Sequence, residues 1–164
     1  MKIITAFVSL IIAANLYAAI SNGMTYIGTY AQPGQTFMMG YMDQATCVED
    51  RGDWDTDMEL CFFDIEQIVE VTGSSQGYNV VVATWGSNAH SCVFEGAVTE
   101  VLPNALVSKV PTEVYENGTF VPGVCEVTVT YENDVTVNVS TNGKCQTFCG
   151  ARAWLEMGPA TLKE

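Results

Sequence analysis

Between residues 125 and 140 the sequence alternates between apolar and polar side chains with a period of two, in two runs separated by a short polar segment. Valine, cysteine or tyrosine occupies every second position of the runs 125–131 and 135–139, and β-branched and aromatic residues fit the pleated surface of a sheet. Directly opposed residues of an antiparallel pair share a face, so Tyr131 must face Val135 for the apolar rows to coincide. The pattern therefore predicts a hairpin with the loop 132–134.

Other segments rich in β-branched and aromatic residues are bounded by turn signals such as Pro103-Asn104. Segment 59–72 also carries apolar residues at helical spacing, but its odd positions fit period two and favour a strand. Many short strands separated by turns predict an all-β fold, an antiparallel barrel or sandwich stapled by disulfides. The further expected strands are 24–31, 36–42, 59–72, 78–85, 91–101 and 105–110.

The first residues have the pattern of a secretory signal, with Lys2 before a mostly apolar stretch at 3–14 and a small residue at Ala18. This stretch is too short for a membrane anchor, because a hydrocarbon core needs about 20 apolar residues. We expect residues 1–18 to be a signal peptide and residues 19–164 to form a single all-β domain. The mature protein is then secreted or periplasmic, without a membrane span.

All six cysteines follow the expected signal, and an even number in an exported chain predicts disulfides. Zinc is the competing interpretation, but zinc sites use C-x2-C pairs or several histidines, whereas this chain has one close pair, Cys145 and Cys149, and one histidine, His90. Cys47 and Cys61 flank one acidic loop and are expected to pair with each other. Spacing alone leaves the pairing of the remaining cysteines open: Cys92, Cys125, Cys145 and Cys149.

The chain is strongly acidic, with a formal net charge of −13 that becomes −14 when Lys2 leaves with the signal. Such a surface repels the phosphates of nucleic acids and acidic membrane surfaces, so neither is an expected partner. It attracts cations, either a metal ion or a basic protein. The alternative is that the acidity only keeps an exported protein in solution.

The side chains offer little for catalysis. A serine or cysteine nucleophile needs a base beside it, and the only histidine is His90, close to a cysteine that is expected to be oxidised. Two carboxylates could hydrolyse a glycoside, but the sequence selects no pair among 19 acids. We expect no enzyme activity and no cofactor, and a carboxylate- or metal-dependent hydrolase is the alternative.

The densest acidic stretch is residues 49–59. Asp53, Asp55 and Asp57 match the first three ligands of a calcium loop. Met58 stands where the turn of such a loop needs glycine, so a solvated acidic loop is the favoured interpretation and no metal is expected. The three aspartates are instead the expected contacts with a basic protein partner.

Three cysteine-containing segments form a recognisable pattern: HSCVFEG at 90–96, CEVTV at 125–129 and CQTFCGARAWL at 145–155. The pattern resembles the cysteine framework of small bacterial periplasmic or secreted proteins, some of them described as lysozyme-inhibitor-like, and covers about half the chain. The resemblance implies the pairs Cys92 with Cys149 and Cys125 with Cys145. It also implies inhibition of a lysozyme, a cationic muramidase, although membership of the framework is broader than that activity.

The chain departs from the pattern at residues 158–160, where Gly-Pro-Ala lacks the tyrosine of a Gly-x-Tyr ending. The loop 140–144 is the nearest candidate for an inhibitory loop, since it is small and polar with one cation, and it adds Asn142 and Lys144 to the expected partner contacts. The sequence thus predicts a monomeric, disulfide-bonded binding module. A structural or general envelope protein without catalytic activity is the alternative.

Overall fold

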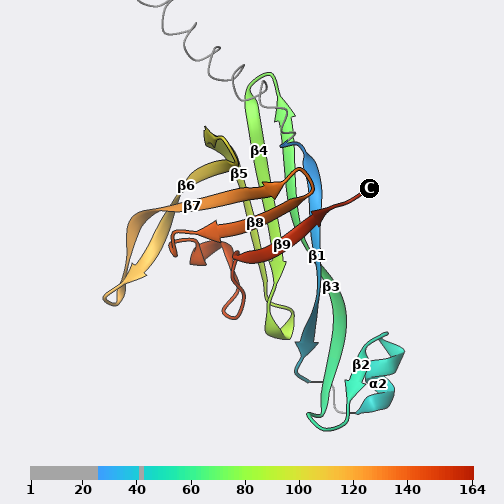
Figure 1. The fold of residues 1–164 in the computed structure, drawn as a ribbon. Helices are drawn as coiled ribbons and strands as arrows, with labels where there is room; N and C mark the ends of the chain where they lie inside the picture. The colour runs from blue at the N-terminus through green and yellow to red at the C-terminus, as the bar shows by residue number, and fades with distance from the viewer. Residues whose placement is uncertain (1–25, 41–42) are drawn as a thin grey trace, which may run out of the picture.

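The computed structural model describes residues 26–40 and 43–164, so the expected signal at 1–18 lies outside the described residues. Eight strands form a closed antiparallel barrel, because the first, β1 (Gly28–Met38), pairs both with β3 (Leu60–Ser74) and with the last, β9 (Met157–Leu162) (Figure 1). This confirms the all-β, disulfide-stapled fold class and selects the barrel. No helix in the described part of the chain is long and apolar enough to cross a membrane.

The elements are β1 (Gly28–Met38), α2 (Gln44–Glu49), β2 (Asp53–Asp55), β3 (Leu60–Ser74), β4 (Gly77–Trp85), η1 (Ser87–Ala89), β5 (Ser91–Leu102), β6 (Ala105–Glu116), β7 (Thr119–Asn133), β8 (Thr136–Thr141), η2 (Gln146–Phe148) and β9 (Met157–Leu162).

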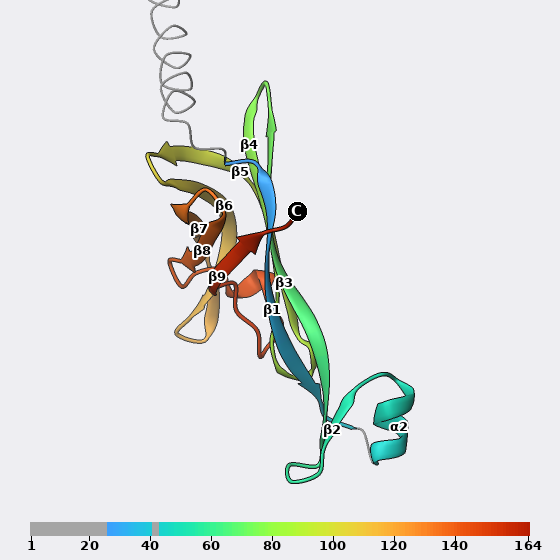
Figure 2. The same cartoon turned by 45° about the vertical axis from the view of Figure 1, so that its right-hand side comes forward.

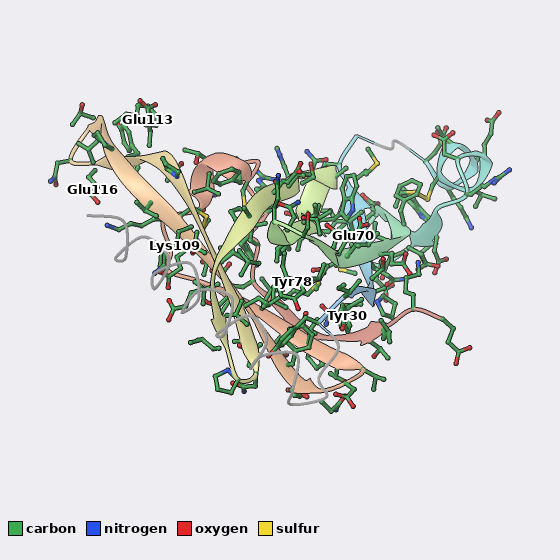
Figure 3. All side chains as sticks on the ribbon, turned by 90° about the horizontal axis from the view of Figure 1, so that it is seen from above. Tyr30, Glu70, Tyr78, Lys109, Glu113 and Glu116 are labelled. Atoms are coloured by element: carbon green, nitrogen blue, oxygen red, sulfur yellow. A yellow bond between two sulfur atoms is a disulfide. The ribbon has the colours of Figure 1, made fainter. Side chains whose placement is uncertain are left out.

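Side chains fill the barrel. An eight-stranded barrel has an interior just wide enough for side chains or one small ligand, and here the inward positions are almost completely buried. Tyr30 lies within the barrel (Figure 3) and packs edge to face against Tyr131, with ring centroids 5.8 Å apart. The largest fully buried side chains include Tyr30, Tyr131, Phe94, Leu106 and Leu155.

The hairpin of β7 and β8 forms, but the predicted register is wrong by two residues. Tyr131 faces Val137, and the pairing shifts at a bulge beside it, between Tyr131 and Asn133. The side chain of Asn133 accepts a hydrogen bond from the backbone N–H of Val135 at 2.9 Å, so Val135 lies in the turn and is 49% exposed. The apolar side chains of both strands still share one face of the sheet, because the register differs from the predicted one by an even number of residues.

Two other strand predictions need correction. Segments 24–31 and 36–42 are predicted as separate strands, yet β1 runs through Pro33 and Gly34 without a break. Beyond Ala31, β1 pairs with β3 alone, and a proline is tolerated where its missing N–H faces no partner strand. The closing strand β9 is absent from the prediction because Gly158 and Pro159 are rare in strands. A register shift between Val137 and Val139 of β8 accommodates them.

The six cysteines form the disulfides Cys47–Cys61, Cys92–Cys149 and Cys125–Cys145. These are the three pairs expected from loop proximity and from the family resemblance. Disulfides persist in compartments more oxidising than the cytosol, so the structure indicates a protein located outside the cytoplasm.

Two parts of the chain project from the barrel on opposite sides of the molecule, both toward the lower side of the view in Figures 1 and 2. The first, called the acidic arm, consists of residues 32–40 and 43–67. In it β1 and β3 pair with each other beyond the points where β9 and β4 stop pairing with them, and α2 and β2 sit at the tip. The second, called the ribbon, consists of residues 109–126, where β6 and β7 pair only with each other.

Candidate functional site

The tip of the acidic arm is held by the disulfide between α2 and β3. Both Cys47 and Cys61 are fully buried, and Gly52 packs directly on them: a Cβ at this position would lie 2.2 Å from the sulfur of Cys61. Asp43 caps α2 by accepting hydrogen bonds from the backbone N–H and the hydroxyl of Thr46, at 2.9 and 3.1 Å. A short helix, a disulfide and a close-packed glycine therefore fix the path of the acidic loop.

The three predicted aspartates lie together on this tip. Asp53 and Asp55 share one face of β2, and Asp57 follows in the turn to β3. The carboxylate of Asp55 accepts hydrogen bonds from the backbone N–H groups of Asp57 and Met58, at 2.9 and 2.8 Å. The turn is thus closed by one of the predicted aspartates, while Asp53 and Asp57 remain exposed.

An open groove of about 490 Å³ runs beside the three aspartates. Its lining combines carboxylates with apolar surface, including Met58, which is 56% exposed. The ring of Phe62 packs edge to face against that of Phe37, its cross-strand neighbour on β1, with ring centroids 6.1 Å apart. The lining residues are Gln35, Asp53, Trp54, Asp55, Thr56, Asp57, Met58 and Phe62.

The arm carries more than half of the net charge of the protein. Residues 43–64 contain eight of the 19 acids and a single cation, Arg51, which gives this span a net charge of −7. Within residues 26–40 and 43–164 no group of three or more His, Cys, Asp or Glu has a geometry that could hold a metal ion. The negative charge is therefore spread over the tip of the arm.

The second predicted segment, 140–144, follows β8 and lies beside the ribbon. The side chain of Asn142 donates to the carbonyl oxygen of Val124 at 2.9 Å and accepts from the backbone N–H of Glu126 at 3.2 Å and of Lys144 at 3.1 Å. Its amide thus bonds to β7 where β8 stops pairing with it. Lys144 lines an open groove of about 630 Å³ between this loop and the ribbon.

The five predicted contact residues do not form one site. Asp53, Asp55 and Asp57 line the groove on the arm, whereas Lys144 lines a different groove beside the ribbon, and Asn142 bonds to β7. The structure therefore brings the aspartates together and leaves the loop at 140–144 apart from them.

Disulfides join all three segments that carry the family resemblance, since 145–155 is bonded both to 90–96 and to 125–129. Cys92 and Cys149 are bonded, and the backbone N–H of Gly150 donates to the carbonyl oxygen of Ser91 at 2.8 Å. The guanidinium of Arg152 lies 3.6 Å from the sulfur of Met39 on the arm, and none of the ion pairs within the described residues includes it. Arg152 therefore contacts the arm just beyond the end of β1.

The ribbon carries a surface that the expected strands did not include, since the strand predicted at 105–110 ends where the ribbon begins. Tyr115 and Phe120 oppose each other near its tip, are 65% and 62% exposed, and contact edge to face with centroids 5.1 Å apart. The Asn117-Gly118 dipeptide between them is a strong hairpin signal, and both residues have positive φ, 51° and 87°. That signal could have located the ribbon in the sequence.

No protein-family model, curated protein or solved structure matches this chain. The geometry and charge of the two projecting surfaces are therefore the basis for inferring a function.

Proposed function

We propose that the protein is a secreted or periplasmic binding module that recognises a cationic protein through the tip of the acidic arm and has no turnover of its own. The candidate partner is a muramidase of the lysozyme class, whose activity the bound protein inhibits. The single observation that carries the proposal is the arm itself: a charge of −7 concentrated over residues 43–64 and held out from the barrel on a disulfide-closed tip.

The construction of the arm favours recognition over a role in solubility alone. A solubilising charge needs no fixed geometry, whereas this tip is fixed by Cys47–Cys61, by the close packing of Gly52 and by the turn that Asp55 closes. The hydroxyl of Thr36 also donates to the carbonyl oxygen of Gly86 at 2.6 Å, which ties β1 of the arm to the connection between β4 and β5. A rigid binding surface loses less conformational entropy when it engages a partner.

The choice of a muramidase rests on the resemblance to lysozyme-inhibitor-like proteins. The disulfides Cys92–Cys149 and Cys125–Cys145 are the pairs that this resemblance implies. Export rests on the signal pattern at residues 1–18 and on the three disulfides.

Charge contributes mainly to the rate at which the partners meet. Long-range attraction between a strongly acidic and a strongly basic protein raises the association rate by about 10- to 1000-fold. The attraction fades as the Debye length shortens from about 10 Å at 0.1 M salt to about 3 Å at 1 M. We therefore expect association to slow by at least about tenfold over this range, with a smaller change in the dissociation rate.

The test is a titration of the mature protein against a basic lysozyme, with binding measured by calorimetry and inhibition measured by cell-wall lysis. Cytochrome c, a basic protein without muramidase activity, is the control for charge alone. The proposal predicts saturable binding of lysozyme with loss of lysis, and much weaker binding of cytochrome c. Equal affinity for lysozyme and cytochrome c would show that the attraction is nonspecific and would contradict the proposal. The absence of lysozyme binding at low salt would also exclude it.

A further inference from the structure

We infer that the outer face of the ribbon is a second contact surface, on which Tyr115 and Phe120 anchor the same cationic partner by apolar contact. The inference rests on the proposed function and deepens it, because it assigns the acidic arm to attraction and the ribbon to anchoring. The expected complement is a patch of apolar side chains bordered by lysine or arginine.

The outer face of the ribbon is largely apolar, and Tyr115 and Phe120 line the open groove that the ribbon forms with Lys144. Alternate residues of β6 and β7 share this face, and the cross-strand pairs on it are Tyr115 with Phe120, Glu113 with Pro122, and Pro111 with Val124. All of these side chains are exposed, including Val124 at 44%. The opposite face is covered, because Thr112 hydrogen bonds to Thr147 and Cys125 is bonded to Cys145. An exposed apolar face of this kind is characteristic of an interaction site.

A partner must use the face of the ribbon and not its edges. The two-residue turn makes Glu116 and Thr119 the first hydrogen-bonded pair, so that the pairs containing Pro122 and Pro111 are not hydrogen bonded. At such positions the backbone nitrogen points away from the other strand, which places one proline on each free edge. Neither edge can then extend the sheet with an added strand over these residues.

The charges around the aromatic pair select a basic partner. Glu113 and Glu116 lie at the outer end of the ribbon and Lys109 lies nearer the barrel (Figure 3). Lys109 is neutralised by ion pairs to Glu126 at 3.3 Å and Glu100 at 3.9 Å. Glu113 and Glu116 flank the aromatic pair, and Lys144 lines the same groove as Glu113. The net charge of the chain, −13, disfavours both an acidic membrane surface and a second copy of the chain.

The position of the ribbon fits joint use with the acidic arm. Both extend toward the lower side of the barrel in Figures 1 and 2, on opposite sides of the molecule as Figure 3 shows, so a large partner that spans this side would contact both surfaces. Interfaces commonly combine a charged periphery, which sets the association rate, with a few aromatic side chains that carry most of the affinity. Tyrosine and phenylalanine at the tip supply large apolar area with few rotatable bonds.

The test compares Y115S/F120S with the matched variant I27S/V135S, which also removes two exposed apolar side chains, 51% and 49% exposed, outside the ribbon. Affinity for lysozyme is measured for both, and circular dichroism checks that both are folded. The inference predicts that Y115S/F120S raises Kd at least about tenfold, mainly through faster dissociation, while I27S/V135S changes it less than about twofold. A second variant, E113K/E116K, should also weaken binding while keeping the aromatic pair.

The outcomes separate the two proposals. Wild-type protein that does not bind lysozyme would remove the proposed function and this inference together. Binding that is weakened by substituting the arm aspartates but is equal for Y115S/F120S and I27S/V135S would overturn only the inference. Affinity of the wild type for phosphatidylcholine vesicles, or self-association in sedimentation, that is lost in Y115S/F120S while lysozyme binding is retained would assign the face to a membrane or to a second copy and would also overturn it.

Discussion

The hydroxyl of Tyr131 donates a hydrogen bond to the backbone carbonyl oxygen of Tyr26 at 2.7 Å, and the two rings contact edge to face at 4.9 Å between centroids. This pair joins β7 to the segment that leads into β1, 105 residues earlier in the chain. The hydroxyl of Tyr26 in turn donates to the carbonyl oxygen of Leu102 at 3.0 Å. A tyrosine network therefore ties the first described residues to the turn between β5 and β6.

The tyrosine network predicts a loss of stability at alkaline pH. Burial raises the pKa values of Tyr131, Tyr26 and Tyr30 above the ordinary value of 10.0. Their contribution is fully present below pH 10, where the unfolded chain also keeps them neutral, and is lost as the pH rises from 10 toward the raised values. Urea unfolding between pH 8 and 12 should show a falling midpoint, with phenolate absorbance appearing on unfolding. A midpoint that is constant over this range would contradict the prediction.

Replacing Tyr131 with phenylalanine tests the hydrogen bond separately from the ring. We expect Y131F to lower the free energy of unfolding by about 1 to 2 kcal/mol, because the buried carbonyl of Tyr26 loses its donor. Urea unfolding at pH 7 measures the change. The control is Y115F, which alters an exposed hydroxyl and should change the free energy by less than about 0.5 kcal/mol. Similar effects of the two substitutions would show that the hydrogen bond is not stabilising.

Asn142 and Lys144 are expected to contribute differently to the stability of the protein. Asn142→Ala removes two hydrogen bonds that tie the loop to β7 and one within the loop, and should cost about 1 kcal/mol of stability, since the site is exposed. Lys144→Ser should leave stability unchanged. Thermal unfolding of both variants measures this difference, and lysozyme binding shows whether either residue contacts the partner. An unchanged stability of Asn142→Ala together with lost binding would make Asn142 a contact residue instead.

Removing the disulfide at the arm tip should weaken binding without unfolding the barrel. The bond joins residues 14 apart, and closing a loop of this length stabilises by about 3 kcal/mol in chain-entropy terms. We expect C47S/C61S to keep the circular dichroism of the barrel, to become sensitive to proteolysis within residues 43–60, and to bind lysozyme more weakly. Wild-type affinity in a variant with a cleavable tip would show that the fixed shape of the arm is unnecessary.

Period-two patterns identify the strands whose residues alternate between core and solvent. Their register depends on features outside the pattern, since the bulge beside Tyr131 and the side chain of Asn133 place Val135 in the turn. The closing strand β9 is hidden because Gly158 and Pro159 have low strand propensity, and pairing with β8 and β1 overrides that propensity.

The acidic loop is evident in the sequence because its charges are close together in the chain. The projection of the arm from the barrel is not evident in the sequence. The arm exists because β9 pairs with β1 only at Tyr30 and Ala31, and β4 pairs with β3 only from Ile68 onward. Those limits are set by contacts between distant strands. The same holds for the ribbon, whose turn is marked by Asn117-Gly118 but whose exposed face depends on where β5 and β8 stop pairing.

The central claim is that the arm tip recognises a cationic protein, and the most direct test is the affinity for lysozyme of the variant D53N/D55N/D57N. The matched control is E70Q/D134N/E164Q, which removes the same charge from exposed acids outside the arm. At 0.1 M salt we predict that the arm variant raises Kd at least about tenfold and that the control raises it less than about threefold, because nearby charges act more strongly than distant ones. An equal rise in Kd for the two variants would contradict the claim, because it would show that the acidic residues attract lysozyme without regard to their position.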